Sequence, residues 1–279
     1  MTVLEEAARR EAPPQTPRRT RRWTRWVLPV YTWLVIIYLV LPIMVMIAFG
    51  FNDTKSRLNL TWQGLTFHWY RDVFSNAALS AAFRNTLLIA VLTTAVATVL
   101  GTMLGLALGR YRFRGQGGVD LLIFAAISAP ELVLGTALLS MFITLRVPRG
   151  FLTILVAHIM FCVSFVAVTV RARMAGFDVS LEEAAQDLGA DPWTTFRKVT
   201  LPLIFPGIMA GALLAFALSI DDYIITSFVN GQTETFPIWV FGATRQGVPP
   251  QVNVMGTLLF LTGVGLAVAN VVALRRRKL

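Results

Sequence analysis

Long stretches without a charged side chain dominate this sequence and constrain its fold more than any other feature. Five carry no charge and one carries only Glu131, and they cover residues 26–52, 85–109, 121–145, 150–170, 199–220 and about 254–274. Each stretch is long enough to cross the hydrocarbon core of a bilayer as a helix, which takes about 20 residues. Because lipid offers the backbone no hydrogen-bonding partners, helices are expected rather than open strands. The sequence therefore predicts an all-α integral membrane protein with six transmembrane helices.

The composition supports a membrane protein. Hydrophobic residues make up 56% of the chain and charged residues 14%, whereas soluble domains carry about 25% charged residues. The first apolar stretch is too long for a cleaved signal peptide, and no small-residue cleavage site follows it. Residues 1–25 are rich in proline and arginine and cannot bury a core. We expect them to form a disordered basic tail, followed by a six-helix transmembrane domain at 26–279.

The net charge of +10 at pH 7 is distributed unevenly along the chain. If six helices cross the membrane, both termini and the second and fourth connections share one side. That side carries 18 of the 25 lysine and arginine residues. The positive-inside rule then places the N-terminus and the C-terminus in the cytoplasm. We interpret the basic excess as an orientation signal and a contact with anionic membrane lipids, and we expect no nucleic acid partner.

Glycines recur at four-residue spacing in two of the apolar stretches. One set is Gly101, Gly105 and Gly109, and the other is Gly207 and Gly211. Small residues at this spacing share a helix face and let two helices approach closely in lipid. We expect these faces to pack against neighbouring helices.

A polar segment at residues 178–202 separates the fourth and fifth apolar stretches. It contains Ser180 and, three residues later, Glu183, a spacing typical of a capping box at a helix N-terminus. We therefore predict a short helix over residues 181–188. Gly189 follows and can adopt the left-handed conformation that ends a helix.

A second short helix is predicted directly after the first. Asp191 can cap its N-terminus with Pro192 at the first helical position, and the helix should end near Thr200. The first helix has a small apolar face formed by Leu181, Ala184, Ala185 and Leu188. A two-turn helix is marginal alone, so it either rests on this protein's own helices or docks on another protein. The residues alone leave both alternatives open.

The polar segment resembles the EAA loop of ABC importer permeases. The matching positions are Glu183, Ala184, Ala185, Gly189, Val199, Leu201 and Pro202, with valine at position 199 in place of the more usual isoleucine. Its place between the fourth and fifth of six helices also agrees with that family. The resemblance implies a type I ABC importer permease (MetI-like) fold. It also implies a coupling helix, including Leu188, that docks into a cytoplasmic ABC ATPase dimer.

Two further stretches resemble the spermidine/putrescine branch of these permeases. They are "FALSIDDYIITSFVNG" at 216–231 and "TFPIWVFGATRQGVPPQVNVMGTLL" at 235–259. This resemblance implies a permease subunit of an ATP-driven importer that moves polyamines across the bacterial inner membrane into the cytoplasm. It also implies a second permease subunit that is a distinct chain, and an extracytoplasmic solute-binding protein. An importer permease for another small organic solute is the alternative.

Ionisable and aromatic residues near the apolar stretches are candidates for the substrate pathway. Asp221 and Asp222 follow the fifth stretch, where carboxylates would attract a dication and replace part of its hydration. Tyr223 and Trp239 can add cation–π contacts. Glu131, within the third stretch, either lines the pathway or pairs with a neighbouring subunit. The alternative for the aspartate pair is a helix cap at the water interface.

Motifs for catalysis are missing from the sequence. It has no G-x-x-x-x-G-K-[ST] phosphate loop, no H-E-x-x-H zinc motif and no G-x-S-x-G nucleophile turn. We therefore expect no enzyme activity, no catalytic residue, no cofactor and no metal site, with ATP hydrolysed by a separate subunit. Cys162, His68 and His158 are interpreted as packing or hydrogen-bonding residues. A secondary transporter working alone on an ion gradient is less favoured, because only Glu131 is a candidate ionisable group near a membrane centre.

Overall fold

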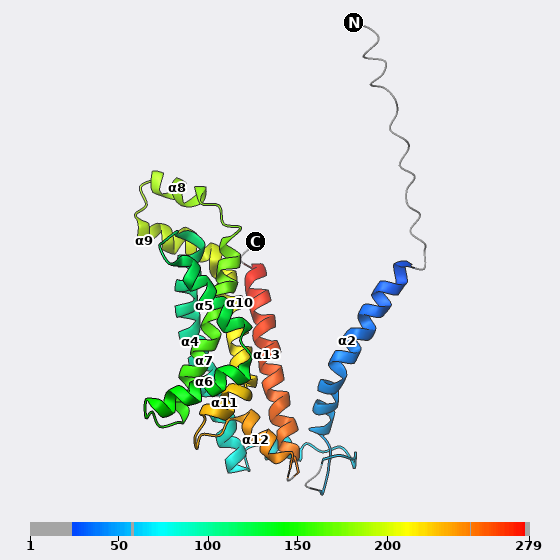
Figure 1. The fold of residues 1–279 in the computed structure, drawn as a ribbon. Helices are drawn as coiled ribbons and strands as arrows, with labels where there is room; N and C mark the ends of the chain where they lie inside the picture. Colours follow the sequence, from blue (N-terminus) through cyan, green and yellow to red (C-terminus); the bar gives the residue numbers. More distant parts are fainter. Residues whose placement is uncertain (1–23, 57–58, 246, 277–279) are drawn as a thin grey trace, which may run out of the picture. The chain divides into compact units, whose positions relative to one another are not determined.

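The computed structural model describes residues 24–56, 59–245 and 247–276, and these residues are mainly α-helical (Figure 1). Within them, the extended structure is limited to an isolated bridge between Asn52 and Leu65. The helices are α2 (Thr24–Phe49), α3 (His68–Arg71), α4 (Ala77–Arg110), α5 (Gln116–Ser128), α6 (Glu131–Thr144), α7 (Phe151–Met174), α8 (Ser180–Asp187), α9 (Pro192–Thr195), a π-helical turn (Phe196–Thr200), α10 (Leu201–Asp221), α11 (Ile224–Val229), α12 (Phe236–Ala243) and α13 (Pro250–Arg276). Among the described residues, five helices are long and apolar enough to span a membrane, and the bent pair α5 and α6 can form a sixth span.

The described residues divide into two compact units, with the boundary between residues 45 and 46. The first unit contains most of α2, which is the first predicted transmembrane helix and begins at Thr24. The predicted disordered tail covers residues 1–25. Of these, residues 1–23 lie outside the described residues. The second unit contains the other helices, including the polar segment.

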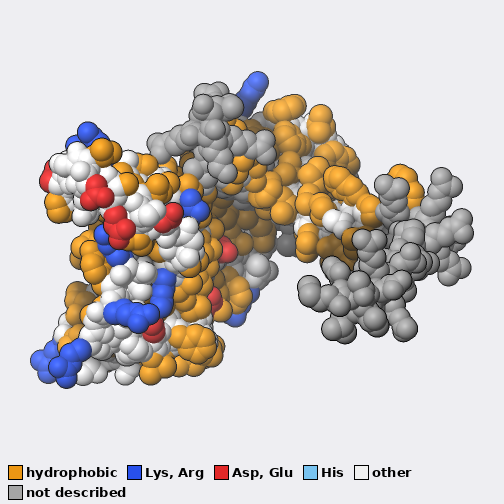
Figure 2. All heavy atoms as spheres, turned by 90° about the horizontal axis from the view of Figure 1, so that it is seen from above, with side chains coloured by type: hydrophobic (Ala, Val, Ile, Leu, Met, Phe, Trp, Pro, Cys, Tyr) orange, Lys and Arg blue, Asp and Glu red, His pale blue; other side chains and the backbone are white. Residues whose placement is uncertain are grey.

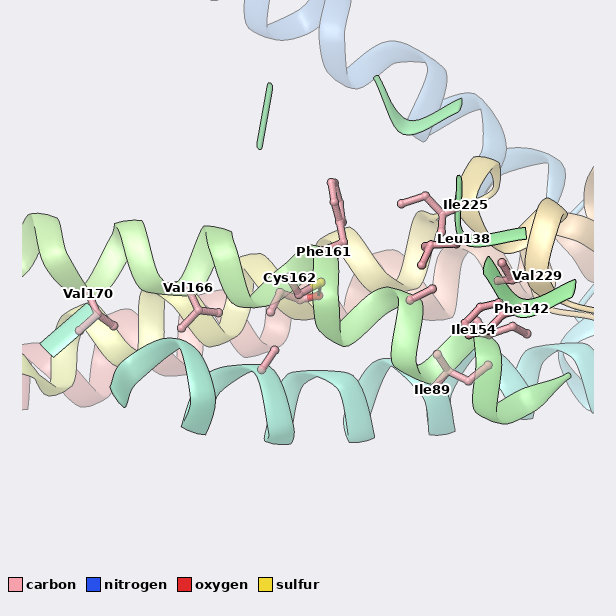
Figure 3. Packing of buried hydrophobic residues seen from close by; sticks show 13 residues of the cluster. Ile89, Leu138, Phe142, Ile154, Phe161, Cys162, Val166, Val170, Ile225 and Val229 are labelled. Atoms are coloured by element: carbon pink, nitrogen blue, oxygen red, sulfur yellow. Dashed lines mark hydrogen bonds between the residues drawn. The ribbon is translucent and has the colours of Figure 1, made fainter. Parts of the chain in front are cut away.

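Helix α7 is the centre of the second unit, and α4 and α10 pack along it (Figure 3). Its apolar residues are buried over five turns, from Ile154 through Cys162 to Val170. The cluster is completed by Ile89 of α4, Leu138 of α6 and Ile225 of α11. A helix that is apolar on all sides and packed between others is suited to the interior of a membrane bundle.

The spaced glycines let α4 and α10 approach α7 closely, as their pattern predicts. A Cβ atom built on Gly101 of α4 would lie 2.6 Å from the Cβ of Val166. One built on Gly207 of α10 would lie 2.7 Å from the Cβ of Arg173. Since real Cβ atoms do not come this close, neither position can take a larger side chain without moving a helix.

The third predicted helix, over residues 121–145, is wrong as a single straight element. The structure instead has α5 and α6, which meet at an angle of 108°. Pro130 has no N–H to donate and disfavours a helical conformation in the residue before it. Ala129 accordingly has an extended backbone, with φ −67° and ψ 135°. Glu131 is therefore the first residue of α6 and does not lie in the middle of a straight span.

The second predicted helix also begins earlier than its apolar stretch. Helix α4 starts at Ala77, where the side chain of Asn76 accepts a hydrogen bond of 3.1 Å from the N–H of Leu79. Capping of this kind satisfies a backbone donor that would otherwise lack a partner. The apolar stretch, which begins after Arg84, therefore omits the first two turns of the helix.

A second apolar cluster lies at the end of the bundle where α4 begins. Phe83 of α4 packs edge-on against Phe236 of α12, with ring centroids 5.9 Å apart. Val254 and Met255 of α13 join this cluster. The cluster fixes α12, which is too short to span a membrane, against two long helices.

Candidate functional site

The polar segment forms two short helices separated by a turn, largely as predicted. Gly189 has a φ of +87°, the left-handed conformation that ends α8. The carboxylate of Asp191 accepts hydrogen bonds from the N–H groups of Trp193 (2.9 Å) and Thr194 (3.1 Å). Pro192 is the first residue of α9. The predicted cap and proline position are thus confirmed.

The side chain of Asp191 also accepts a hydrogen bond from the hydroxyl of Thr194 at 2.6 Å. This bond and those from the backbone lower the pKa of the Asp191 carboxyl below its usual value. A carboxyl with a lowered pKa favours the folded cap above the pKa it has in the unfolded chain. That contribution is lost as the pH falls through the pKa of the folded state. The contribution of this carboxylate to the cap is therefore present at neutral pH.

The predicted capping box of Ser180 and Glu183 is wrong. Ser180 is the first residue of α8. Val179 occupies the N-cap position, and its side chain forms no capping hydrogen bond. The N–H of Ser180 instead donates a hydrogen bond of 3.0 Å to the carboxylate of Asp178. Hydrogen bonds from the Ser180 hydroxyl and then from its N–H lower the pKa of the Asp178 carboxyl. A charged carboxylate is a stronger acceptor than a serine hydroxyl. This explains why Asp178 is the acceptor at this end of α8 and Ser180 is a donor.

The predicted end of the second short helix near Thr200 is also wrong. Helix α9 continues through the π-helical turn into α10, and residues 192–221 form one helix. At this turn the N–H of Leu201 donates to the carbonyl of Phe196. The wider turn accommodates Pro202, which cannot donate a backbone hydrogen bond. Leu201 and Pro202 therefore lie inside a continuous helix.

The predicted coupling residues of α8 are mostly exposed at one end of the second unit (Figure 1). Leu181 is 47% exposed and Leu188 is 90% exposed. Glu183 and Ala184 are exposed as well, and Ala185 is half-buried. Viewed onto this end, charged side chains of both signs gather on the surface (Figure 2). The structure thus presents an apolar and charged face of α8 to the surroundings.

Glu182, beside these residues, faces the opposite way and was not predicted as a site residue. It is 1% exposed and forms an ion pair with Arg110, the last residue of α4. Its carboxylate also accepts a hydrogen bond from the hydroxyl of Thr200. A buried charge needs partners of this kind to offset its lost hydration.

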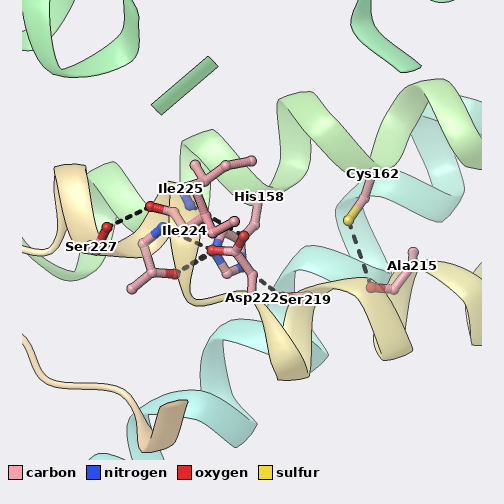
Figure 4. A network of polar contacts seen from close by, with 9 residues as sticks. His158, Cys162, Ala215, Ser219, Asp222, Ile224, Ile225 and Ser227 are labelled. Carbon is pink, nitrogen blue, oxygen red and sulfur yellow. Dashed lines mark hydrogen bonds and ion pairs between the residues drawn. The ribbon is translucent and has the colours of Figure 1, made fainter. Parts of the chain in front are cut away.

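Asp222 belongs to a buried polar network between α7, α10 and α11 (Figure 4). Its side chain is 5% exposed, and one carboxylate oxygen lies 3.1 Å from Nε2 of His158. The same oxygen accepts hydrogen bonds from the N–H (2.8 Å) and the hydroxyl (2.7 Å) of Thr226. Nδ1 of His158 lies 2.8 Å from the hydroxyl of Ser219. His158 is thus a hydrogen-bonding residue, as predicted, and Asp222 caps α11.

Asp221 is separated from its neighbour because α10 ends between them. It is exposed and lines an apolar groove of about 530 Å³ with Tyr223, Phe241 and residues of α12 and α13. The ring centroids of Tyr223 and Phe241 lie 4.6 Å apart. A carboxylate beside aromatic rings is an arrangement that suits an organic cation.

The other pathway candidates do not all meet at this groove. Trp239 lines a separate groove of about 420 Å³ together with Asn76 and Glu234. Glu131 is the first residue of α6, directly after the bend, and is half-buried. The structure therefore brings together Asp221 and Tyr223 and sets Trp239 apart. Among the described residues, no three histidine, cysteine or carboxylate side chains are close enough to hold a metal ion.

The chain is similar to known transport proteins over most of its length. Residues 101–276 match the family model of the binding-protein-dependent transport system inner membrane component. The spermidine/putrescine transport system permease protein PotC of Haemophilus influenzae is 36% identical over 88% of this chain and 95% of its own length. PotC of Escherichia coli K12 is 39% identical over 84% and 88% of the two chains. The putrescine transport system permease protein PotI of the same strain is 38% identical over 82% and 83%.

Solved structures agree with the fold. A bacterial ABC transporter involved in the import of the acidic polysaccharide alginate contains a chain with a TM-score of 0.64 and 19% identity, covering 93% of this chain and 99% of that one. The MetNI methionine ABC transporter contains one with a TM-score of 0.61 and 18% identity, covering 71% and 95%. The predicted fold class, a type I ABC importer permease, is thereby confirmed. The chain belongs to the family of binding-protein-dependent transport system inner membrane components.

Proposed function

We propose that this chain is the permease subunit of an ATP-driven importer that moves polyamines into the cytoplasm. The observation that carries the proposal is its similarity to permeases named for spermidine and putrescine. That similarity reaches 36–39% identity and extends over more than four fifths of the chain. An importer permease for another small organic solute is the second candidate, because the solved structures of this fold include transporters named for alginate and for methionine.

In this proposal, α8 is the coupling helix that docks into a cytoplasmic ABC ATPase. Its exposed face, with Glu183, Ala184 and Leu188, supplies a surface on which a partner can sit. Gly189 ends α8, and the continuous helix from Pro192 through Pro202 connects the segment to α10. This end of the second unit would face the cytoplasm, and we place both termini on the cytoplasmic side of the membrane by the positive-inside rule. The transmembrane domain would cover residues 26–279 and follow a basic tail.

The proposed assembly has further members. A second permease subunit, a distinct chain, would complete the pore, and an extracytoplasmic solute-binding protein would deliver the substrate. One solved structure of this fold is described as an alginate transporter in complex with a periplasmic protein that carries an alginate pentasaccharide. Such an assembly in a relative of the same fold supports a similar arrangement here. Anionic lipids would contact the basic side of the chain.

The proposed substrate contacts are carboxylates and aromatic rings. Asp221 and Tyr223 share the groove beside α12, and Glu131 at the start of α6 would add a further carboxylate to the pathway. A protonated amine would exchange part of its hydration for these groups. Trp239 would act from the neighbouring groove, at a different stage of passage. Asp222, held by His158 and Thr226, would fix the backbone that carries Asp221.

An uptake assay tests the substrate. The importer, purified with its partner subunits and placed in proteoliposomes, should accumulate labelled putrescine or spermidine only when ATP is supplied. Replacing Asp221→Asn should lower the initial rate by about tenfold, because the groove loses the charge that attracts a cation. The matched control is Asp72→Asn, which removes a half-exposed carboxylate in the connection before α4. Polyamines that neither accumulate nor compete would contradict the substrate, and uptake that survives without ATP would contradict the importer.

Crosslinking tests the ATPase contact. A photoreactive group on Ala184→Cys should trap a nucleotide-hydrolysing protein in native membranes, because that side chain is exposed on α8. The native Cys162 is fully buried and should not react. The matched control is Ser75→Cys, which is exposed beside the opposite end of α4. Equal trapping from both positions, or none from Ala184, would argue against α8 as the coupling helix.

A further inference from the structure

The contacts of Glu182 join three parts of the chain that are distant in sequence. Glu182 lies in α8, Arg110 is the last residue of α4, and Thr200 ends the π-helical turn that leads into α10. The carboxylate forms an ion pair with the Arg110 guanidinium and accepts a hydrogen bond from the Thr200 hydroxyl. One side chain therefore connects the short helix to two of the long helices.

Burial distinguishes this contact from an ordinary surface ion pair. The Glu182 side chain is 2% exposed and that of Arg110 is 34% exposed. Thr200 is 1% exposed. By comparison, the pair of Arg171 and Asp120 at the same end is 41% and 34% exposed, and it joins α7 to α5 without involving α8. A buried pair is not superior to apolar packing in stability, and its best-attested use is to fix a particular arrangement.

The two faces of α8 differ in their surroundings. To transmit a force, the helix needs one face free for a partner and one face attached to the bundle. The outward face is open to a partner, since Leu181, Ala184 and Leu188 are exposed. The inward face is held by Glu182. Backbone contacts of α8 are made mainly with α9 and the π-helical turn, which lead into α10. The ion pair with Arg110 adds a direct connection to α4, which packs along α7 through Gly101.

We propose that Glu182 is a positioning residue that fixes α8 to the adjoining ends of α4 and α10, so that a displacement of α8 moves both helices. The inference rests on the proposed role of α8 as the coupling helix. It assigns a function to a residue that points away from the docking face. Without the carboxylate, α8 would still bind its partner, but its movement would reach α4 poorly.

The experiment uses the complete importer in lipid nanodiscs and proteoliposomes. Glu182→Gln keeps the shape of the side chain and removes its charge. We expect this variant to retain its ATPase subunits and to hydrolyse ATP, while the substrate transported per ATP hydrolysed falls by about fivefold. Thr200→Val, which removes the hydroxyl and leaves the ion pair, should lower the same ratio by about twofold. Thr200→Val also tests the inference if the importer with Glu182→Gln does not assemble.

A rescue separates positioning from general destabilisation. Arg110→Gln alone should lower the ratio as Glu182→Gln does, because each leaves a charge without its partner. The double variant, with glutamine at both positions, can form an amide hydrogen bond, and its ratio should return to within about twofold of the wild type. Asp120→Asn is the matched control, since it breaks the other ion pair at this end, and the ratio should stay unchanged.

The outcomes distinguish this inference from the proposed function. If the wild-type chain neither binds an ATPase nor transports, the proposed function fails. If the wild-type importer works and Glu182→Gln and Thr200→Val leave the ratio unchanged, the inference fails alone. It also fails if assembly and transport fall in proportion with an unchanged ratio, or if the double variant is no better than the single ones.

Discussion

Replacing Gly101 with leucine should prevent α4 from packing on α7 and leave little folded protein in the membrane. A Cβ at this position would lie 2.6 Å from the Cβ of Val166 and 2.9 Å from the carbonyl oxygen of Val163. Backbone and Cβ atoms cannot rotate away, so the two helices must separate. Overpacking of this kind costs about 3 kcal/mol, and separated helices also lose the contacts that glycine permits. The yield and the thermal unfolding midpoint of the detergent-solubilised chain measure the effect.

A matched control and a compensating pair make this prediction specific. Gly265 lies in α13 and has no atom within 4 Å of an added Cβ, so Gly265→Leu should leave the midpoint unchanged or higher. In the pair of Gly101→Ala and Val166→Gly, the Cβ that the new methyl group would meet is absent, so the two losses of midpoint should sum to more than the loss of the double variant. A Gly101→Leu chain as stable as the wild type would show that α4 and α7 do not pack through this glycine.

Replacing His158 with leucine should destabilise the chain by about 3 kcal/mol. The substitution leaves the 5%-exposed Asp222 carboxylate without its ring partner and removes the contact to Ser219. The hydrogen bonds from Thr226 remain, so the loss is partial. Thermal unfolding of the purified chain measures the change. Cys162→Ala is the matched control, because it removes one buried atom a turn away on α7 and should cost about 1 kcal/mol.

A double-mutant cycle tests whether His158 and Asp222 act together. Asp222→Asn removes the charge while an amide oxygen can still accept from the Thr226 N–H. Adding His158→Leu to it should cost about 1 kcal/mol less than His158→Leu in the wild type, because no charge is left unpaired. Strictly additive losses would show that the contact of 3.1 Å does not couple the two residues.

The membrane spans were predictable because a bilayer imposes one length and one polarity on every helix that crosses it. The apolar stretches therefore located α2, α4, α7, α10 and α13 without any knowledge of packing. Their ends were less predictable, since capping and continuation depend on polar residues outside each stretch. The cap at Asn76 places the start of α4 before Arg84 in the sequence. A π-helical turn joins α10 to α9, so that the continuous helix begins at Pro192.

Pro130 was a visible signal for the break in the third span, but the bend was not foreseeable in size. A proline removes one hydrogen bond and kinks a helix. The angle of 108° also depends on where α6 packs, and its neighbour α11 is nearly a hundred residues further along the chain. Gly135 of α6 lies against the ring of Phe228 of α11, a contact that no local pattern contains.

The candidate site was predictable where its residues interact locally. Gly189 and Asp191 act on their immediate neighbours, and both predictions were confirmed. Asp221 and Asp222 were treated as a pair because they are adjacent, yet the chain turns at Asp222, with φ −63° and ψ 118°. Glu182 was missed because its partner Arg110 is 72 residues away. No window of sequence joins them.

The bend between α5 and α6 restricts what can surround it. At Ala129 the backbone leaves the helix, so carbonyl groups there lose the N–H partners that a straight span would give them. Hydrocarbon tails offer no replacement donors, and irregular backbone at membrane depth is stable only beside protein or water. Where the bend lies within the hydrocarbon layer, it therefore needs another polypeptide or an aqueous passage beside it in place of lipid.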